Sequence, residues 1–399
     1  MLRHFSLETT RIFYMRSTAE GQRQRINELG LSENVWAAWR TAYGKLAIDA
    51  IASPMLYCFY IITGGKERQE TLMVRFAVIG TNIITDMFLE AAKEVEGFVL
   101  RGVYSRTMER AQAYAARYGA ERTFDSLEEL AACEEIDAVY IASPNSLHAA
   151  QTIRMLRAEK HVLCEKTIAS NLREFEEMKR TAEEHQTVLL EAMRSVHAPG
   201  FRAIRENLKK LGVIRRISFQ FCKYSSRYDN YKKGVIENAF NPVLSNGALM
   251  DIGVYCVHPA VALFGMPKQI KSSALKLSNG VDGAGTILLE YGEMQGELVY
   301  SKISDSRVAS QIQGEDGTMV IGEIQNPQDV VIYYRTGETE KLSIPQTDRD
   351  MCYEIRDFLE LIAKKNARHP WLSYSGMELE LMDEVRRQQG IIFPADPAE

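Results

Sequence analysis

The fold of this chain is decided by Val74-Arg75-Phe76-Ala77-Val78-Ile79-Gly80, an apolar run that ends in glycine. A short apolar run bounded by a turn residue is typical of a buried strand. The next segment carries an apolar stripe at helical spacing, made of Ile83, Ile84, Met87, Phe88, Ala91, Ala92 and Val95. The sequence therefore predicts a strand, a tight turn and a helix at this point.

The same alternation continues to about residue 193. We expect further strands at 98–104, 138–142, 161–164 and 188–191, separated by helices at 107–118, 146–159 and 170–184. Strands that alternate with helices predict a doubly wound parallel sheet with helices on both faces. We assign this first domain to residues 73–193.

From residue 194 to 399 the pattern is different, and we assign these residues to a second, α+β domain. Long β-type runs occur at 214–222, 269–277, 286–291, 297–303 and 330–334. Their alternation of apolar and polar residues predicts a large, mostly antiparallel open sheet with one packed face. We expect helices at 251–264, 350–364 and 376–389 to cover that face.

Residues 1–72 form an atypical leader. They hold two of the three tryptophans, Trp36 and Trp39, and show no clear strand–helix alternation. Our hypothesis is that the leader is an artefact of the choice of gene start or is disordered, because codons for Gln69-Glu70 can resemble a ribosome-binding site just before Met73. The alternative is a genuine accessory extension.

Composition narrows the classes of partner. The formal net charge is -5 and no long basic run is present, which argues against nucleic acid. Six cysteines without C-x-x-C spacing argue against a metal site or a disulfide scaffold and fit a reducing cytoplasm. The most membrane-like stretch, Ala47 to Thr63, contains Asp49 and Pro54 and is shorter than the roughly 20 residues that a spanning helix needs. We therefore expect a cytoplasmic protein with no membrane partner.

A dinucleotide site is indicated where the first strand meets its helix, at Gly80-Thr81-Asn82-Ile83-Ile84. Such a loop needs glycine for a tight turn and for close approach of the backbone to pyrophosphate. Only the first glycine of G-x-G-x-x-G is present, and Asn82 occupies the second position, where we expect it to use its tolerance of left-handed backbone geometry. By itself the motif leaves a nucleotide site and a plain structural turn equally open.

The end of the second strand predicts which dinucleotide binds. An NAD site usually has an acidic residue there, whereas this chain has Tyr104-Ser105-Arg106. Ser105 can bond a 2′-phosphate and Arg106 can neutralise it, which favours NADP(H) over NAD(H). Arg110 is a further candidate for contact with the cofactor. The alternative for Arg106 is a solvated arginine in a loop.

Two more strand ends supply candidate cofactor contacts, because ligands bind at the carboxyl ends of strands in open α/β sheets. The first end carries Ala142, Ser143, Asn145 and His148, with the last two expected to face the mouth of a cleft. His148 could equally be an exposed residue at a helix start. The second end carries Glu165 and Lys166.

A possible proton relay joins Lys166 to a distant segment. Asp251, Tyr255 and His258 have i, i+4, i+7 spacing and would share one face of a helix. An ammonium near a phenol favours phenolate, which would bring Tyr255 closer to general-base work. The alternative is a core tyrosine beside an aspartate that merely suits the helix dipole.

The segment 223–231 combines aromatic side chains with hydrogen-bond donors, Arg227 and Tyr228 among them. We interpret it as a loop that could stack on and bind a polyol. An ordinary surface or dimer-contact loop fits the pattern equally well.

Taken in order, these segments resemble the glucose–fructose oxidoreductase, inositol dehydrogenase and rhizopine-catabolism family (Gfo/Idh/MocA), over nearly all of 73–399. The resemblance rests on the series 80–84, 104–106, 143–148, 160–166 and 247–255, not on one motif. It looks closest to uncharacterised bacillar members and to the dihydrodiol and aldose dehydrogenase branch. It implies a Rossmann domain followed by an α+β domain whose open sheet often forms a dimer interface, so we expect a homo-oligomer, either dimer or tetramer.

The resemblance also implies roles for the candidate residues. Lys166 matches the lysine of the family's Glu-Lys-Pro motif, which contacts nicotinamide and substrate. Tyr255 matches the proton donor and acceptor, with Asp251 as a positioning group. The implied activity is an NADP(H)-dependent oxidoreductase, with NAD possible, acting on a secondary alcohol or ketone or an aldose. The implied substrate is a sugar, polyol or dihydrodiol bound by Lys166, Arg227, Tyr228, Asp251 and Tyr255.

The chain departs from the family pattern at three places: the leader, Asn82 and Thr167. Thr167 stands where the family has proline, so we expect the backbone that aims Lys166 to be less constrained. Two other functions stay open. One is a non-catalytic sensor that binds NAD(P), and the other is an NAD-dependent glycoside hydrolase of the same family.

Overall fold

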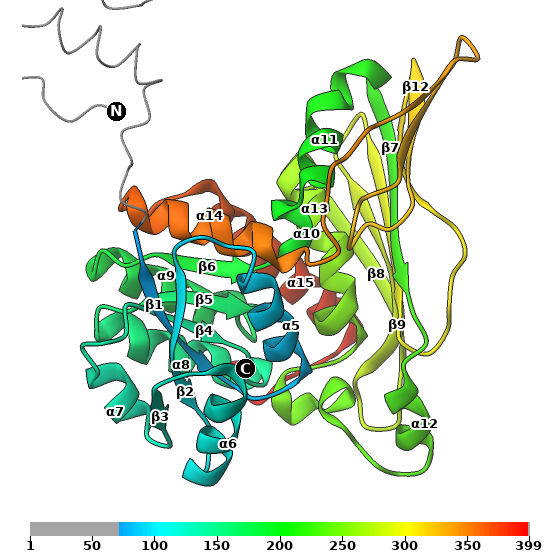
Figure 1. The fold of residues 1–399 in the computed structure, drawn as a ribbon. Coiled ribbons are helices and arrows are strands. Elements are labelled where there is room, and N and C mark those ends of the chain that lie inside the picture. The colour runs from blue at the N-terminus through cyan, green and yellow to red at the C-terminus, as the bar shows by residue number, and fades with distance from the viewer. Residues whose placement is uncertain (1–71, 398–399) are drawn as a thin grey trace, which may run out of the picture. The chain divides into compact units, whose positions relative to one another are not determined.

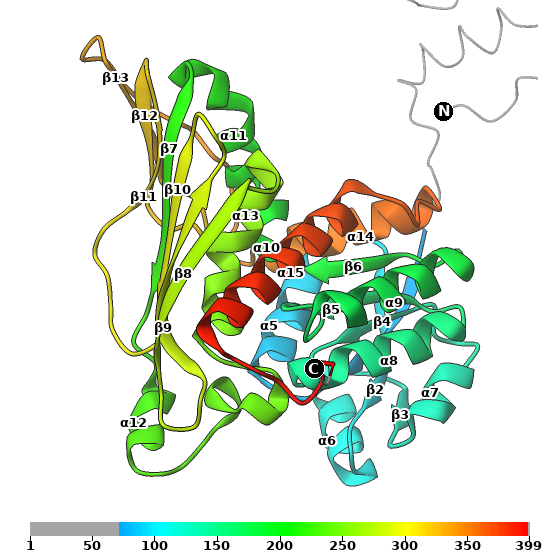
Figure 2. The same cartoon turned by 180° about the vertical axis from the view of Figure 1, so that it is seen from behind.

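The computed structural model describes residues 72–397. The expectations for the leader and for the stretch 47–63 lie outside these residues. The described part contains two sheets, one of six strands and one of eight, and Figures 1 and 2 show them side by side with helices between and around them.

The first sheet is parallel, as predicted. Its strands are β1 (Val74–Ile79), β2 (Phe98–Tyr104), β3 (Arg122–Phe124), β4 (Ala138–Ile141), β5 (His161–Glu165) and β6 (Leu189–Ala192), in the order β3-β2-β1-β4-β5-β6. The connecting helices are α5 (Ile83–Ala92), α6 (Met108–Tyr118), α7 (Leu127–Ala132), α8 (Asn145–Arg157) and α9 (Leu172–Glu184). The order reverses between β1 and β4, and this switch point is where ligands bind in open α/β sheets.

Both faces of this sheet are covered, which explains its continuous apolar strands. On β1, Phe76 and Val78 face a core shared with α5, α6 and α14, whereas Ala77 and Ile79 face a core shared with α7, α8 and α9. Successive side chains of a strand point to opposite faces, so one apolar run supplies both cores.

The second sheet has eight strands in the order β14-β13-β12-β11-β7-β10-β9-β8. They are β7 (Ile214–Cys222), β8 (Gln269–Lys276), β9 (Asp282–Glu290), β10 (Gln295–Ser301), β11 (Ser310–Gly314), β12 (Gly317–Ile321), β13 (Val330–Tyr334) and β14 (Thr339–Lys341). Only the β7–β10 pair is parallel. The prediction of a mostly antiparallel second sheet is confirmed.

The helices of residues 194–397, called the second half below, do not all cover this sheet. They are α10 (Arg194–His197), α11 (Pro199–Asn207), α12 (Ser226–Lys232), α13 (Val254–Phe264), α14 (Met351–Ala363) and α15 (Pro370–Gln389). Our placement of the 350–364 helix on the second sheet was wrong, because α14 packs into the core of the first sheet beside α5. Helix α15 contacts α13 and β8 on one side and α9 and β6 on the other, so it joins the two halves.

The segment Pro242–Phe264 is long and apolar enough to cross a membrane by length and composition alone, but 78% of its most apolar window is buried inside the fold. This weak signal is what a core helix gives, and α13 supplies core residues to the second sheet.

Candidate active site

The loop after β1 is built for close packing at the switch point. Gly80 has φ +109°, and a Cβ there would lie 2.6 Å from the carbonyl oxygen of Ala142, which follows β4. Only glycine fits both the backbone angle and the contact. The turn therefore keeps the loops after β1 and β4 close together.

Asn82 stands in this loop for a reason other than the one we expected. Its φ is −122° and its ψ 179°, which is extended backbone, so the left-handed explanation was wrong. Its side-chain oxygen instead accepts hydrogen bonds from the backbone amides of Ile84 and Thr85, and its amide nitrogen donates to the Ala142 carbonyl at 2.7 Å. Asn82 is thus the N-cap of α5, a position that this residue type favours.

The end of β2 lies beside this loop. Arg110 of α6 donates from Nε to the Thr81 hydroxyl at 2.6 Å and from its terminal nitrogen to the Thr81 carbonyl at 2.8 Å. Ser105 is buried and its backbone amide donates to Phe124, while the Arg106 side chain is exposed. Arg106 is therefore an exposed cation at the end of β2, and Arg110 holds the loop after β1 in place through Thr81.

The residues after β4 are more enclosed than we expected. Asn145 is 8% exposed and donates to the carbonyl of Ser245 in the second half at 3.1 Å. His148 is fully buried, with Nδ1 2.9 Å from the Thr167 carbonyl and Nε2 2.8 Å from the Ser143 carbonyl. Our expectation that His148 faces the cleft mouth was wrong, since it is internal and supports the backbone of two strand ends.

The segment after β5 is tightly held, contrary to our expectation for Thr167. The Lys166–Thr167 peptide is cis. The Thr167 hydroxyl donates to the Met250 carbonyl at 2.8 Å, and the Thr167 carbonyl contacts His148. Ile168 donates its amide to Glu191 at 3.0 Å. Hydrogen bonds to three other segments therefore constrain this backbone without proline.

Lys166 meets Asp251 across the boundary between the two halves. Its ammonium donates to the Asp251 carbonyl at 2.7 Å and to the carboxylate at 3.0 Å. Burial by itself lowers the pKa of Lys166, but Asp251, Tyr255 and Glu165 together outweigh this effect and raise the pKa above its ordinary value. Lys166 is therefore a cation.

Lys302 is a second cation on Asp251, and sequence reasoning missed it. It follows β10, is 3% exposed, and its ammonium bonds the other oxygen of the Asp251 carboxylate. Burial raises the pKa of Asp251, but Lys166 and Lys302 together hold it well below its usual range. The sequence did contain a signal that Lys302 is buried. Leu298, Tyr300 and Lys302 are alternate residues on the buried face of β10 and the residue after it.

Tyr255 lies beside this ion-pair cluster. It is 7% exposed, with the Lys166 ammonium 5.2 Å and the Arg194 guanidinium 5.8 Å from its ring centroid. Within residues 72–397 no group hydrogen-bonds the Tyr255 hydroxyl, which leaves it available to a ligand. Burial raises the pKa of Tyr255; Lys166 and Arg194 lower it but do not overcome burial, so the net direction is upward. Lys166 therefore favours the phenolate, as we expected, while burial keeps the pKa of Tyr255 above its ordinary value.

The helical face that we predicted for Asp251, Tyr255 and His258 is broken. Asp251 lies in a π-helical turn, Leu249–Gly253, and α13 begins at Val254. The wider turn presents the Asp251 carboxylate to the two lysines, while His258 bonds Glu378 instead of the Lys166 group. The structure thus brings Lys166, Asp251 and Tyr255 together and leaves His258 out.

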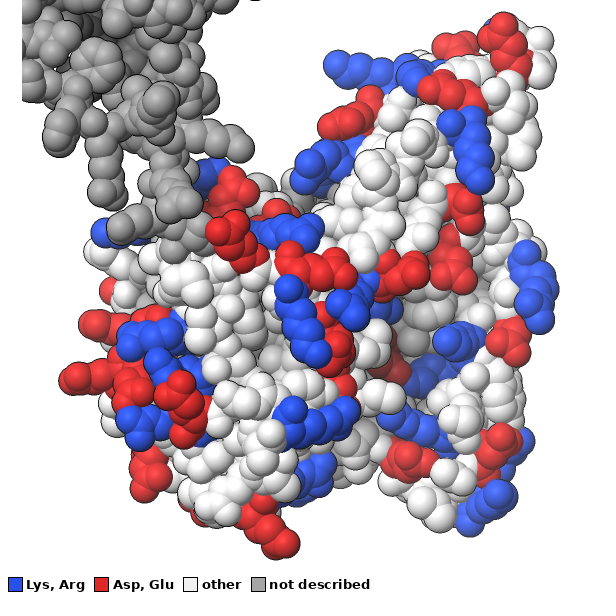
Figure 3. Space-filling model, in the orientation of Figure 1, with Lys and Arg blue, Asp and Glu red and all other residues white. Residues whose placement is uncertain are grey.

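The segment 223–231 is partly a short helix, α12, and not only a loop. Arg227 is exposed and lies 3.7 Å from Glu237, and the Tyr228 ring lies 5.8 Å from Phe240. The Lys302 ammonium lies 5.2 Å from the same Phe240 ring, so the segment is linked to the Asp251 cluster through Phe240. Figure 3 shows this face hollowed between the two halves, with Lys and Arg as well as Asp and Glu side chains around the hollow.

Residues 74–193 match the family described as "Oxidoreductase family, NAD-binding Rossmann fold", and residues 201–320 match "GFO/IDH/MocA C-terminal domain". The chain is 48% identical over 328 residues to scyllo-inositol 2-dehydrogenase (NADP(+)) IolU of Bacillus subtilis, a match that covers 82% of this chain and 100% of that protein. The chain belongs to the GFO/IDH/MocA oxidoreductase family. The resemblance noted in the sequence is confirmed.

Two further matches are less similar. Human trans-1,2-dihydrobenzene-1,2-diol dehydrogenase is 27% identical over 344 residues, covering 82% of this chain and 99% of that protein. A crystal structure of KijD10, a 3-ketoreductase from Actinomadura kijaniata in complex with NADP and TDP-benzene, superposes with a TM-score of 0.71 at 24% identity, covering 79% of this chain and 98% of that chain. This likeness shows the shared fold.

Proposed function

We propose that this family member is an NADP(H)-dependent dehydrogenase that exchanges hydride with a secondary hydroxyl group of a polyol, sugar or dihydrodiol, with Tyr255 moving the proton. The observation that carries the proposal is the Tyr255 hydroxyl, which no group within residues 72–397 hydrogen-bonds, on a side chain that is 7% exposed and lies beside the Lys166 ammonium. The names of the Bacillus and human relatives describe dehydrogenases of an inositol and of a ring diol, which supports this substrate class.

The residues at the switch point fit a dinucleotide. Gly80 leaves room for a close backbone approach that a Cβ would fill. Together with Thr81, Asn82, Ile83 and Ile84 it would hold the pyrophosphate side, while Ala142, Ser143, Asn145, His148 and Glu165 shape the strand ends toward the nicotinamide. A bound nicotinamide would supply the hydride acceptor.

The rest of the reaction falls to side chains of this chain. An ammonium has three donors, and Lys166 uses two on Asp251, so one is left for the oxygen of a substrate hydroxyl. The ionised form of Tyr255 accepts the proton of that hydroxyl, becoming a neutral phenol, as hydride leaves the same carbon. Lys166 stabilises the charge that develops on the oxygen, and Asp251 keeps the lysine in place. Arg227 and Tyr228 are proposed to contact the remaining hydroxyl groups.

We assign the 2′-phosphate of NADP(H) to Ser105 and Arg106. Arg106 is exposed at the end of β2, where an NAD site usually has an acidic residue. Arg110 already binds Thr81, so it supports the site chiefly by fixing the loop. The NADP(+) in the name of the Bacillus relative supports the same choice.

The function is tested by following the near-ultraviolet absorbance of the nicotinamide while the protein is incubated with NADP+ or NAD+ and a panel of inositols, sugars, glycosides and dihydrodiols. Net NADPH formation with a panel member, abolished by Tyr255→Phe, is the expected result. Sugar release without net reduction would show a glycoside hydrolase instead. Cofactor binding without turnover on the whole panel would show a sensor.

We also propose that the chain forms a homo-oligomer through the open face of the second sheet. Alternation along β8, β9 and β13 puts Leu275, Leu288 and Tyr333 opposite the core-facing residues, and these three are 57%, 52% and 50% exposed. Among residues 72–397 no helix covers this face in Figures 1 and 2. Light scattering with size-exclusion chromatography should give a dimer or tetramer, which Leu288→Lys should weaken. The cytoplasmic location stays a prediction.

A further inference from the structure

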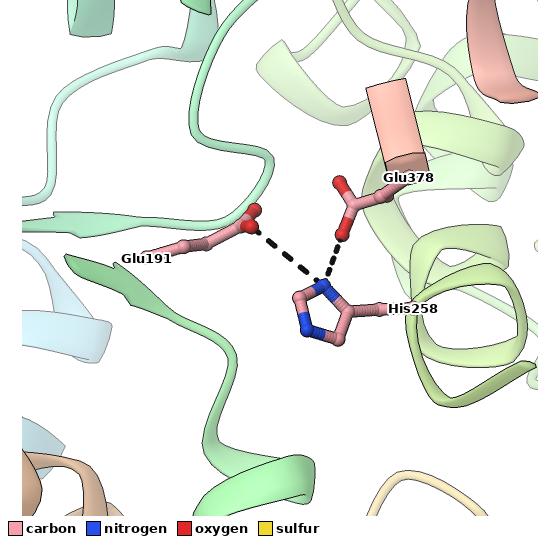
Figure 4. A group of neighbouring side chains, drawn as sticks. All are labelled: Glu191, His258 and Glu378. Atoms are coloured by element: carbon pink, nitrogen blue, oxygen red, sulfur yellow. Dashed lines mark hydrogen bonds and ion pairs between the residues drawn. The ribbon is translucent and has the colours of Figure 1, made fainter. Parts of the chain in front are cut away.

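A buried cluster lies one helical turn beyond Tyr255. It consists of Glu191 of β6, His258 of α13 and Glu378 of α15, each at most 2% exposed. Figure 4 shows the three side chains converging, with His258 Nδ1 2.5 Å from one oxygen of Glu378 and 3.7 Å from one oxygen of Glu191. The proposed reaction does not use this cluster.

The spacing favours a proton over a metal ion between His258 and Glu378. Two atoms that bind one zinc ion at about 2.0–2.2 Å in tetrahedral geometry lie roughly 3.3 Å apart, which is more than the 2.5 Å observed. Without a proton between them, the imidazole lone pair and the carboxylate oxygen would repel each other. Burial also raises the pKa of Glu378 and lowers that of His258 to about 4, so the buried pair shares a proton without carrying a full ion pair.

The oxygens of Glu191 already have partners. One oxygen accepts the backbone amide of Ile168 at 3.0 Å, and the other accepts the Ser375 hydroxyl at 2.6 Å. Ile168 is two residues beyond Lys166. Glu191 therefore connects the Lys166 segment to α15, which carries both Ser375 and Glu378.

His258 connects the same cluster to the tyrosine. It lies three residues after Tyr255 on α13, so the two are about one turn apart. The hydrogen bond between His258 and Glu378 fixes this turn of α13 against α15. The backbone of Lys166 and the helix of Tyr255 are thus both anchored to α15 through one group of side chains.

We propose that Glu191, His258 and Glu378 are positioning residues that hold the Lys166 segment and the Tyr255 helix in register. Glu191 acts through its hydrogen bonds to Ile168 and Ser375, and His258 acts through the proton that it shares with Glu378. The inference rests on the proposed function, because it assigns the cluster to the geometry of that lysine–tyrosine pair. Each of the three is at most 2% exposed, which keeps it out of reach of a bound substrate or cofactor. Their removal should therefore lower the turnover number and leave the affinity for the cofactor nearly unchanged.

The first test compares Glu191→Ala with Glu191→Gln. The alanine variant loses the acceptor for the Ile168 amide, whereas glutamine keeps a carbonyl oxygen of the same reach. A displacement of about 1 Å at a reacting group can cost 10²-fold, so we expect kcat to fall about 10- to 100-fold in Glu191→Ala. Glu191→Gln should restore most of it, and the Kd for NADP+ from fluorescence quenching should stay within about twofold.

His369→Ala is a matched control. His369 is also buried, at 5% exposure, and bonds the Leu189 carbonyl on β6, but it touches neither the Lys166 segment nor α13. Its loss should lower the melting temperature while kcat is retained. If Glu191→Ala does not fold, Ser375→Ala removes only the hydroxyl that holds Glu191, and a smaller loss of kcat, about threefold to tenfold, is expected.

A readout without turnover separates this inference from the proposed function. Hydrogen exchange of peptides spanning 166–170 and 250–258 should be faster in Glu191→Ala or Ser375→Ala and unchanged in His369→Ala. Faster exchange in a protein that oxidises no polyol would contradict the proposed function but support the anchoring of the Lys166 segment and α13 to α15. Unchanged exchange and unchanged kcat in a folded variant would overturn the inference. So would one metal ion per chain in the purified wild-type protein that is lost in Glu191→Ala.

Discussion

Replacing Lys166 with methionine should make the oxidation of a polyol more dependent on alkaline pH. The Lys166 ammonium lies 5.2 Å from the ring centroid of Tyr255. At that distance and an effective dielectric constant of about 20, its attraction for a phenolate is about 3 kcal/mol. Asp251 bonds the same ammonium and offsets part of this attraction.

The expected shift of the rate toward alkaline pH follows from the effect of Lys166 on the pKa of Tyr255. Lys166 lowers the pKa of Tyr255 against the opposing effect of burial. Its removal leaves burial, Glu165 and Glu354 to raise that pKa further, with Arg194 still opposing them. At neutral pH the rate of alcohol oxidation should fall by up to about 10²-fold, which is what about 3 kcal/mol corresponds to. The loss should shrink as the pH rises, because more of the tyrosine is then ionised.

The measurement is kcat/KM for the polyol with saturating NADP+, from about pH 6 to pH 10. Lys166→Arg is the matched control, because it keeps the charge and should keep the alkaline limb near its wild-type position even if its maximum rate is lower. The reasoning fails if kcat/KM of Lys166→Met falls by the same factor at every pH and the alkaline limb of its pH profile does not move. In that case the lysine orients substrate and does not tune Tyr255.

Three further predictions concern other parts of the site. Tyr255→Phe removes the proton acceptor and should cost about 10²-fold or more in kcat while quenching still reports NADP+ binding; near wild-type turnover contradicts the assigned role. Arg106→Ala removes a charge-assisted bond of about 1.5–3 kcal/mol and should lower kcat/KM for NADP+ by roughly 10- to 100-fold with little change for NAD+, whereas equal losses for both cofactors would place the 2′-phosphate elsewhere. Burial raises the pKa of Glu191 to about 8. The stability that this protonated carboxyl contributes is fully present below the pKa of the unfolded chain and is lost as the pH rises through about 8. In urea denaturation Glu191→Gln should therefore flatten the fall in the free energy of unfolding between about pH 5 and pH 8, and an unaltered slope would show that Glu191 is not the titrating group.

The parts of the fold that local pattern could predict are those in which one strand and one helix define their own partners. The run 74–80 and the stripe that follows it specify a buried strand and a helix packed on it, and repetition of that unit leaves few topologies other than a parallel sheet. The apolar stripe of α14 gives no such information. It shows that one face is buried but not against which sheet, and the structure places it on the sheet formed about 200 residues earlier in the chain.

The candidate site divides in the same way. Lys166 and Asp251 could be chosen from sequence because strand ends and helix starts are where polar groups converge. Lys302 and Arg194 were missed because their roles depend on contacts between segments far apart in sequence. Asn82 shows a third case, in which the position was noticed and its reason was wrong: the residue caps a helix through its side chain and does not need unusual backbone angles.

The ion-pair cluster explains why the two sheets and the reacting groups cannot be considered separately. Lys166 comes from the end of β5 in the first sheet, whereas Asp251 and Lys302 come from the second half of the chain. Removing one partner of a buried ion pair leaves an uncompensated charge, which commonly costs several kcal/mol. The carboxylate of Asp251 can therefore keep both lysines charged and oriented only while the two halves stay together as they are. The same interactions that position the ammonium beside Tyr255 also hold the halves together, so geometry suited to proton transfer depends on the stability of this boundary.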